Sequence, residues 1–134
     1  MKVIVCSKLK PLHGYIAKKI IPMGINIIAL NTLEEIEKSI PDRARYALVD
    51  DGDFKIKELV EHILRWKKEK KGVRFIVLTR SSDLQLIKVY VMSGADFVLQ
   101  SSLHLETIAE KFVLFVNQLA TQHEKRKFIR IKFD

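Results

Sequence analysis

The sequence predicts an α/β domain in which a parallel five-stranded sheet carries helices on both faces. Two observations predict this class. Five short apolar segments, each bounded by turn residues, are typical of strands that are buried on both faces. They alternate with five segments whose apolar residues recur with the 3.6-residue period of a helix. Strands and helices that alternate in this way form a parallel sheet through right-handed crossovers.

The first half of the chain supplies three strands and two helices. Pro11 suits the first turn of a helix, and Pro22-Met23-Gly24 ends that helix. Thr32 is a good N-cap for the second helix, because Glu34 and Glu35 follow in its first turn, where negative charge is favoured. We expect strands at residues 2–6, 25–30 and 46–49, and helices at 11–21 and 33–39.

The second half supplies two strands and three helices. The third helix closes at Lys71-Gly72, a glycine C-cap after basic residues. Ser81, Ser82 or Asp83 caps the fourth helix, which Gly94 ends. We expect strands at residues 73–78 and 97–99, and helices at 56–71, 84–93 and 105–119. The apolar positions of the fourth helix are Leu84, Ile87, Val91 and Met92.

Composition bounds the class of protein. The 134 residues are 48% hydrophobic and 30% charged, which is ordinary for a soluble globular domain. No segment approaches the roughly 18 uninterrupted apolar residues of a membrane helix, and we expect no signal peptide. The single cysteine excludes an internal disulfide and fits a reducing cytoplasm. The four histidines stand far apart and no CxxC or HExxH pattern occurs, so we expect no metal site.

Motifs at three predicted strand ends narrow the fold. Val49-Asp50 ends the third strand, Leu78-Thr79 ends the fourth, and Ser93-Gly94-Ala95-Asp96 precedes the fifth. In this order the motifs resemble those of a response-regulator receiver domain, over about residues 2–121. The resemblance implies a flavodoxin-like, doubly wound sheet with strand order 2-1-3-4-5. It divides the chain into a receiver-like domain at 1–121 and a basic tail at 122–134.

The same resemblance assigns the residues of a phosphorylation pocket. Asp50 matches the phosphoacceptor, and Thr79 matches the hydroxyl that contacts the phosphoryl group. The acidic pair that binds Mg²⁺ corresponds to Ser7 and Lys8, and the phosphate-binding lysine corresponds to Ser101. A hydroxyl and a cation in place of two carboxylates disfavour Mg²⁺. We therefore expect a non-catalytic pseudo-receiver that is not an enzyme and holds no cofactor.

Three alternatives remain open at this pocket. Asp50 could cap nearby backbone N–H groups, or it could form an ion pair with Lys8. A phosphorylatable two-component receiver would instead work through Asp50, Asp51 and Thr79 despite the altered residues.

For a binding module, the resemblance implies a partner surface formed by the fourth helix, the fifth strand and the fifth helix. We expect a protein partner or a second copy of the chain to bind there. Phe115 adds an apolar residue beside the stripe of the fifth helix, although it could equally widen the core face. The family's aromatic switch position corresponds to Val98, and the adjacent Phe97 could take its place in part.

The tail has a pattern of its own. From Phe128, apolar residues alternate with charged ones, which is the period of a strand. Arg126 and Arg130 form an RxxxR motif that resembles the opening of a PilZ domain, a β-barrel that binds cyclic di-GMP. The resemblance implies that both arginines bind this dinucleotide in a longer chain, and we expect a C-terminal PilZ domain. The family's D/N-x-S-x-x-G motif is absent, and a plain basic extension is the alternative.

The formal net charge of +8 raises nucleic-acid binding as a further alternative. The basic residues gather in the tail and between Arg65 and Lys71. The sequence has neither a helix-turn-helix nor an aromatic stacking platform. We therefore do not expect a nucleic-acid partner.

Overall fold

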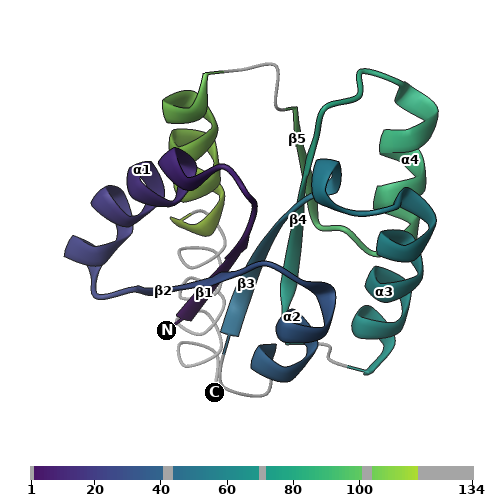
Figure 1. Ribbon diagram of the computed structural model, residues 1–134, viewed down its shortest axis with the longest axis horizontal. Helices are drawn as coiled ribbons and strands as arrows, with labels where there is room; N and C mark the ends of the chain where they lie inside the picture. The colour runs from purple at the N-terminus through teal and green to yellow at the C-terminus, as the bar shows by residue number, and fades with distance from the viewer. Residues whose placement is uncertain (1, 41–43, 70–71, 101–103, 118–134) are drawn as a thin grey trace, which may run out of the picture.

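The computed structural model describes residues 2–40, 44–69, 72–100 and 104–117. It contains a parallel five-stranded sheet with the order β2-β1-β3-β4-β5. Helices cover both faces (Figure 1). The predicted fold class and strand order are confirmed. The strands are β1 (Lys2–Cys6), β2 (Asn26–Leu30), β3 (Ala44–Asp50), β4 (Arg74–Thr79) and β5 (Phe97–Gln100).

The helices are divided between the two faces of the sheet (Figure 1). The first face carries α1 (Lys10–Ile20) and a last helix that is described over 105–117. The second carries α2 (Leu33–Ser39), α3 (Ile56–Glu69) and α4 (Leu84–Ser93). Over the residues described, no helix combines the length and the apolar character that a bilayer span requires.

Each face of the sheet has its own hydrophobic core, because successive strand residues point to opposite faces. In β1, Val3 and Val5 contribute to the core beneath α1 and the last helix. Ile4 and Cys6 contribute to the core beneath α2, α3 and α4. All four are fully buried. This two-sided burial is why the strands are continuous apolar runs without a polar face.

The predicted caps of α2 and α4 are present. The Thr32 hydroxyl accepts a hydrogen bond from the backbone N–H of Glu35 at 3.1 Å. Of the three candidates before α4, Asp83 is the N-cap, and its carboxylate accepts from the N–H of Gln85 at 2.9 Å. Each cap satisfies a backbone donor that the helix itself leaves unpaired.

The Gly94-Ala95-Asp96 segment has a structural role. Gly94 has a φ of 119°, a backbone conformation that residues with a side chain rarely adopt. A Cβ atom at this position would also lie 2.4 Å from Cγ of Lys67, so both the backbone and the packing require glycine. The Asp96 carboxylate accepts from the N–H of Phe75 at 2.7 Å and pairs with the Lys67 ammonium at 3.1 Å. One short segment thus joins the end of α4 to both α3 and β4.

The burial of α4 differs from what its apolar positions indicated. The structure buries Tyr90 and Ser93, whereas Leu84 and Met92 are 77% and 76% exposed. Only one of the ten residues of α4, Lys88, is charged, so the helix is apolar nearly all round and its period does not identify the inner face.

Candidate functional site

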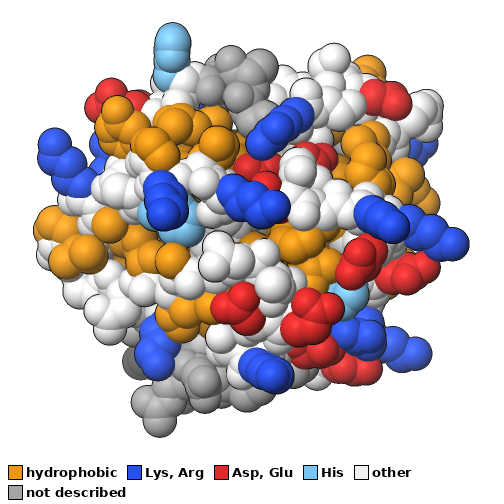
Figure 2. Space-filling view, in the orientation of Figure 1, with side chains coloured by type: hydrophobic (Ala, Val, Ile, Leu, Met, Phe, Trp, Pro, Cys, Tyr) orange, Lys and Arg blue, Asp and Glu red, His pale blue; other side chains and the backbone are white. Residues whose placement is uncertain are grey.

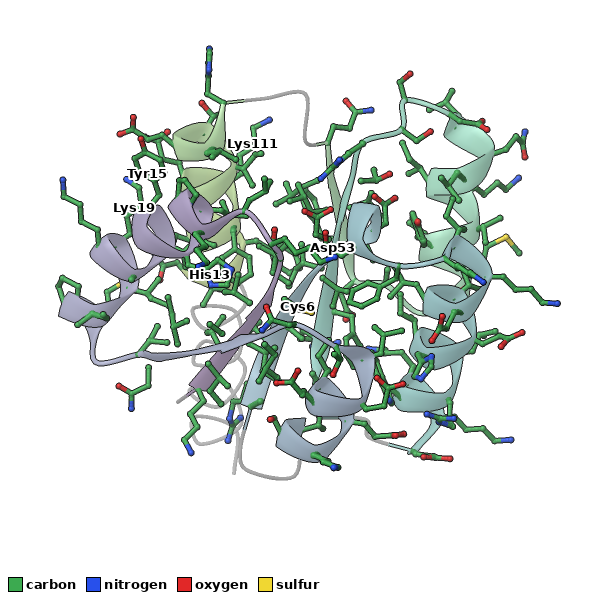
Figure 3. All side chains as sticks on the ribbon, viewed as in Figure 1. Cys6, His13, Tyr15, Lys19, Asp53 and Lys111 are labelled. Carbon is green, nitrogen blue, oxygen red and sulfur yellow. The ribbon has the colours of Figure 1, made fainter. Side chains whose placement is uncertain are left out.

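The candidate site lies at the carboxyl edge of the sheet, where ligands bind in open α/β folds. β1 and β3 pair up to Cys6 and Val49, so the next residues, Ser7 and Asp50, are neighbours. Thr79 ends β4 on the other side of β3. Figure 3 shows Cys6 and Asp53 at this edge. The edge therefore brings together Ser7, Lys8, Asp50, Asp51 and Thr79, whereas Ser101 falls outside the described residues.

Asp50 is fully buried, and hydrogen bonds hold both of its carboxylate oxygens. Oδ2 accepts from the Ser7 hydroxyl at 2.9 Å, and Oδ1 accepts from the backbone N–H of Gly52 at 2.9 Å. The second bond caps the short 3-10 turn Asp51–Asp53. This is the capping arrangement that the sequence left open. Within the described part of the chain, Asp50 forms no ion pair with Lys8.

The pKa of Asp50 is raised above its ordinary value because burial penalises the charged form. The hydrogen bonds from Gly52 and Ser7 oppose this shift, as does the positive charge of Arg80, while the negative charge of Asp53 adds to it. The effect of burial on the pKa outweighs these opposing interactions. The carboxylate is consequently a less readily ionised group than a free aspartate.

Arg80 is a site residue that the sequence reasoning missed. Its guanidinium lies against Gly52, where an added Cβ would be 2.7 Å from the Arg80 Cζ. Because Gly52 has no side chain, the Arg80 guanidinium has room beside the turn that follows β3. In the sequence, only the position of Arg80 directly after Thr79, at the end of β4, could have indicated that it belongs to the site.

Tyr90 is the second residue that was missed. Its side chain is fully buried, and its hydroxyl donates to Oδ2 of Asp51 at 2.8 Å. Asp51 is 7% exposed, and its Oδ1 accepts a long bond of 3.4 Å from the N–H of Arg80. Burial and the Asp51 carboxylate both raise the pKa of Tyr90, so the phenol stays protonated and remains a donor. Asp51 thereby links β3 to α4.

Thr79 and the switch positions are also engaged in packing or turns. Thr79 is fully buried, and its hydroxyl accepts from the N–H of Ser81 at 3.1 Å. Val98 packs against the core under α2, α3 and α4. Phe97 points to the other face, where its ring stacks on Phe115 of the last helix with the centroids 4.9 Å apart. Phe97 and Val98 therefore serve opposite faces of β5.

The edge is poor in metal ligands. In the described ranges, His, Cys, Asp and Glu side chains form no group of three or more that could hold a metal ion. Asp53 accepts from the backbone N–H of Lys8 at 2.9 Å. Burial, with Asp53, Glu35 and Asp50 nearby, raises the pKa of the Cys6 thiol to about 12, so the reactive thiolate is scarce at neutral pH.

Two cations of the basic run in α3 are held by carboxylates. Arg65 pairs with Glu37 at 2.6 Å, and Lys67 pairs with Asp96. These pairs reduce the charge available to a nucleic acid. Residues 70–71 and the whole tail, including Arg126 and Arg130, lie outside the described residues.

Solved structures with the same arrangement include response regulators and their receiver domains. A response regulator from Thermotoga maritima matches with a TM-score of 0.69 and 20% identity, over 87% of this chain and 97% of that one. An orphan response regulator of H. pylori matches with a TM-score of 0.70 and 18% identity, over 85% and 94%. This chain has the receiver fold.

A third solved structure is an atypical orphan response regulator that is described as having a phosphorylation-independent regulatory mechanism. It matches with a TM-score of 0.67 and 18% identity, over 83% of this chain and 91% of that one. No family model matches the sequence, and no curated protein shows significant similarity to it. At these identities the likeness establishes the fold, and function has to be argued from the site.

Proposed function

We propose that this chain is a receiver-like signalling module that binds a protein partner without being phosphorylated. The observation that carries the proposal is the state of Asp50, which is fully buried with Ser7 on one oxygen and Gly52 on the other. A phosphoryl transfer needs an accessible nucleophile and cations that neutralise the transferring group.

The residues around Asp50 support the same conclusion. Ser7 and Lys8 stand where a receiver carries the carboxylates that bind Mg²⁺, and the nearby Asp51 has its Oδ2 hydrogen-bonded to Tyr90. Mg²⁺ requires carboxylate or other oxygen ligands in octahedral geometry, and a lysine ammonium opposes it. The fold likeness to a regulator with a phosphorylation-independent mechanism is consistent with this role.

Acetyl phosphate with Mg²⁺, followed by intact-mass measurement, tests the loss of phosphorylation. We expect no phosphoryl adduct on the wild-type chain. The variant Ser7→Asp with Lys8→Asp restores the acidic pair and should gain Mg²⁺ binding in calorimetry. A Mg²⁺-dependent adduct on the wild type that disappears in Asp50→Asn would show that the site still accepts a phosphoryl group.

The partner surface that we propose comprises α4, β5 and the last helix. Its supporting observation is the outer face of α4, where Leu84, Val91 and Met92 are 77%, 54% and 76% exposed with a single charge, Lys88, in the helix. In β5, Phe97 is 41% exposed, and its ring stacks on Phe115 of the last helix. Apolar side chains that gather on one face in this way mark protein-binding sites.

Sedimentation velocity over a range of concentrations shows whether the partner is a second copy. A homodimer that uses this surface should dissociate in the variant Met92→Glu. It should persist in the control Leu64→Glu, which also replaces an exposed apolar residue by an acidic one but lies on α3, where Leu64 is 51% exposed. A chain that stays monomeric at high concentration excludes the homodimer and leaves a different protein as the partner.

For the tail we propose that Arg126 and Arg130 bind cyclic di-GMP in a longer chain that includes a PilZ domain. Guanidinium groups are planar and permanently charged, which suits both phosphate and guanine. We expect the 134-residue chain to show no micromolar affinity for cyclic di-GMP in calorimetry, because the two arginines lack a barrel to position them.

The single cysteine supports a cytoplasmic setting for the module.

A further inference from the structure

A cavity of about 400 Å³ opens beside the candidate site, between the connections that follow β1 and β2. Its volume lies within the range of about 300–1,000 Å³ that is typical of small-molecule pockets. The cavity is at the carboxyl edge of the sheet, and His13 projects from α1 toward the end of β1 (Figure 3). Its lining residues are Ser7, Lys8, Lys10, His13, Ala29 and Asn31.

The lining is positively charged. It contains two lysines and a histidine and no carboxylate. Lys8 and Lys10 are exposed, and neither forms an ion pair with any described residue. Figure 2 shows lysine or arginine side chains next to a histidine on the face of the molecule that includes this region. The nearby Asp53 carboxylate is bound to the backbone N–H of Lys8 and does not line the cavity.

The donors available to a ligand are side chains. The backbone N–H groups of Lys8, Leu9 and Lys10 are already bonded, to Asp53, to the Ser7 hydroxyl and to the Lys8 carbonyl respectively. What remains is the two ammonium groups, the Asn31 amide and the His13 ring. His13 has Nε2 at 2.7 Å from the Ser7 carbonyl, so Nε2 carries the proton and donates there.

We propose that this cavity binds a small phosphate monoester. A phosphate dianion offers three strong acceptor oxygens and close to two negative charges, which match the two lysines and the Asn31 amide of the lining. A carboxylate would leave one ammonium uncompensated, and a metal ion would meet two cations. The cavity has room for an organic group beyond the phosphate itself. The cavity shares Ser7 and Lys8 with the candidate site, but phosphate binding there does not use the Asp50 carboxylate and does not rest on the proposed function.

Titration of the full 134-residue chain, followed by amide ¹H–¹⁵N shifts at fixed ionic strength, tests this site. The two probes are inorganic phosphate and adenosine 5′-monophosphate. We expect saturable shifts at the lining residues. In the double variant Lys8→Ala with Lys10→Ala, affinity should fall at least tenfold. The matched control is Lys18→Ala with Lys38→Ala, which removes the same charge from exposed positions outside the cavity and should leave affinity unchanged.

The outcomes separate clearly. Tighter binding of the nucleotide shows that the organic group is contacted, and equal binding shows that the phosphoryl group alone is recognised; both support the site. Absence of saturable shifts at the lining residues with either probe overturns the proposal. An equal loss of affinity in the control variant also overturns it, because binding would then follow net charge alone.

Discussion

Removal of one hydroxyl, in Tyr90→Phe, should destabilise the domain by about 2 kcal/mol. The Tyr90 hydroxyl donates to Asp51 at 2.8 Å, and both residues are buried. Without it, the long 3.4 Å bond from the N–H of Arg80 is the one hydrogen bond to the Asp51 carboxylate that remains among the described residues. Hydrogen bonds to charged groups contribute about 1.5–3 kcal/mol, and a buried acceptor without its donor keeps its desolvation cost. For a domain of this size, the loss corresponds to a fall in Tm of roughly 6–10 °C.

Urea unfolding of Tyr90→Phe, beside Tyr15→Phe as the matched control, measures this loss. Tyr15 is 39% exposed and makes no hydrogen bond with a described residue, so its hydroxyl should matter by less than about 0.5 kcal/mol. A double-mutant cycle with Asp51→Asn should give a coupling energy above about 1 kcal/mol. The reasoning is refuted if the two tyrosine variants unfold at the same urea concentration with equal m-values.

Three further predictions follow from local geometry. Gly94→Ala should lower the free energy of unfolding in urea by about 1–3 kcal/mol, because φ is 119° and the added Cβ would clash with Lys67. The control Gly14→Ala, which has open space around it in α1, should raise this free energy by about 0.5–1 kcal/mol. Because the pKa of Asp50 is raised in the folded state, its contribution to stability is greatest below about pH 4 and is lost as pH rises through the folded pKa. In measurements of Tm against pH, Asp50→Asn should remove this pH dependence and raise Tm at pH 7. The thiol of Cys6, buried and with its pKa raised to about 12, should react with iodoacetamide in unfolded chains and far more slowly in folded ones; equal rates would contradict its burial.

The strands were predictable because burial on both faces leaves a strong signal. β1 has the predicted bounds, and each of its inner residues is apolar. β3 is longer than the apolar run from Tyr46 to Val49, since it begins at Ala44 and includes the exposed Arg45. Pairing with β1 starts at Ala44, so the neighbouring strand extends β3 beyond its apolar run.

The inner face of α4 was not predictable by the same reasoning. Leu84, Val91 and Met92 carry as much apolar character as the residues that are buried, so periodicity offers no choice between faces. The orientation of α4 is consistent with the hydrogen bond between Tyr90 and Asp51, two residues that are 39 positions apart in the sequence. A buried phenol needs a partner for its hydroxyl, and this partner lies at the end of β3.

The site was predictable to the extent that neighbouring strands determine it. Ser7 and Asp50 follow paired residues of β1 and β3, so the receiver strand order already implies that they meet. The bond from Gly52 is local to the turn. The positions of Arg80 and Tyr90 could not be predicted in this way. They depend on the course of the chain after β4, and the pattern of the strands does not determine that course.

The two carboxylates at the end of β3 hold structural elements together. Asp50 joins the connection after β1 to the turn after β3, through Ser7 and Gly52. A phosphoryl group on either oxygen of Asp50 would displace one of these donors from a fully buried position, and Ser7 and Lys8 supply no carboxylate pair to hold the Mg²⁺ that the transfer needs. Asn at position 50 would keep an acceptor for Gly52 and present an amide to the Ser7 hydroxyl, without a buried charge. Asp50→Asn is therefore the substitution that separates the hydrogen-bonding role of Asp50 from its charge.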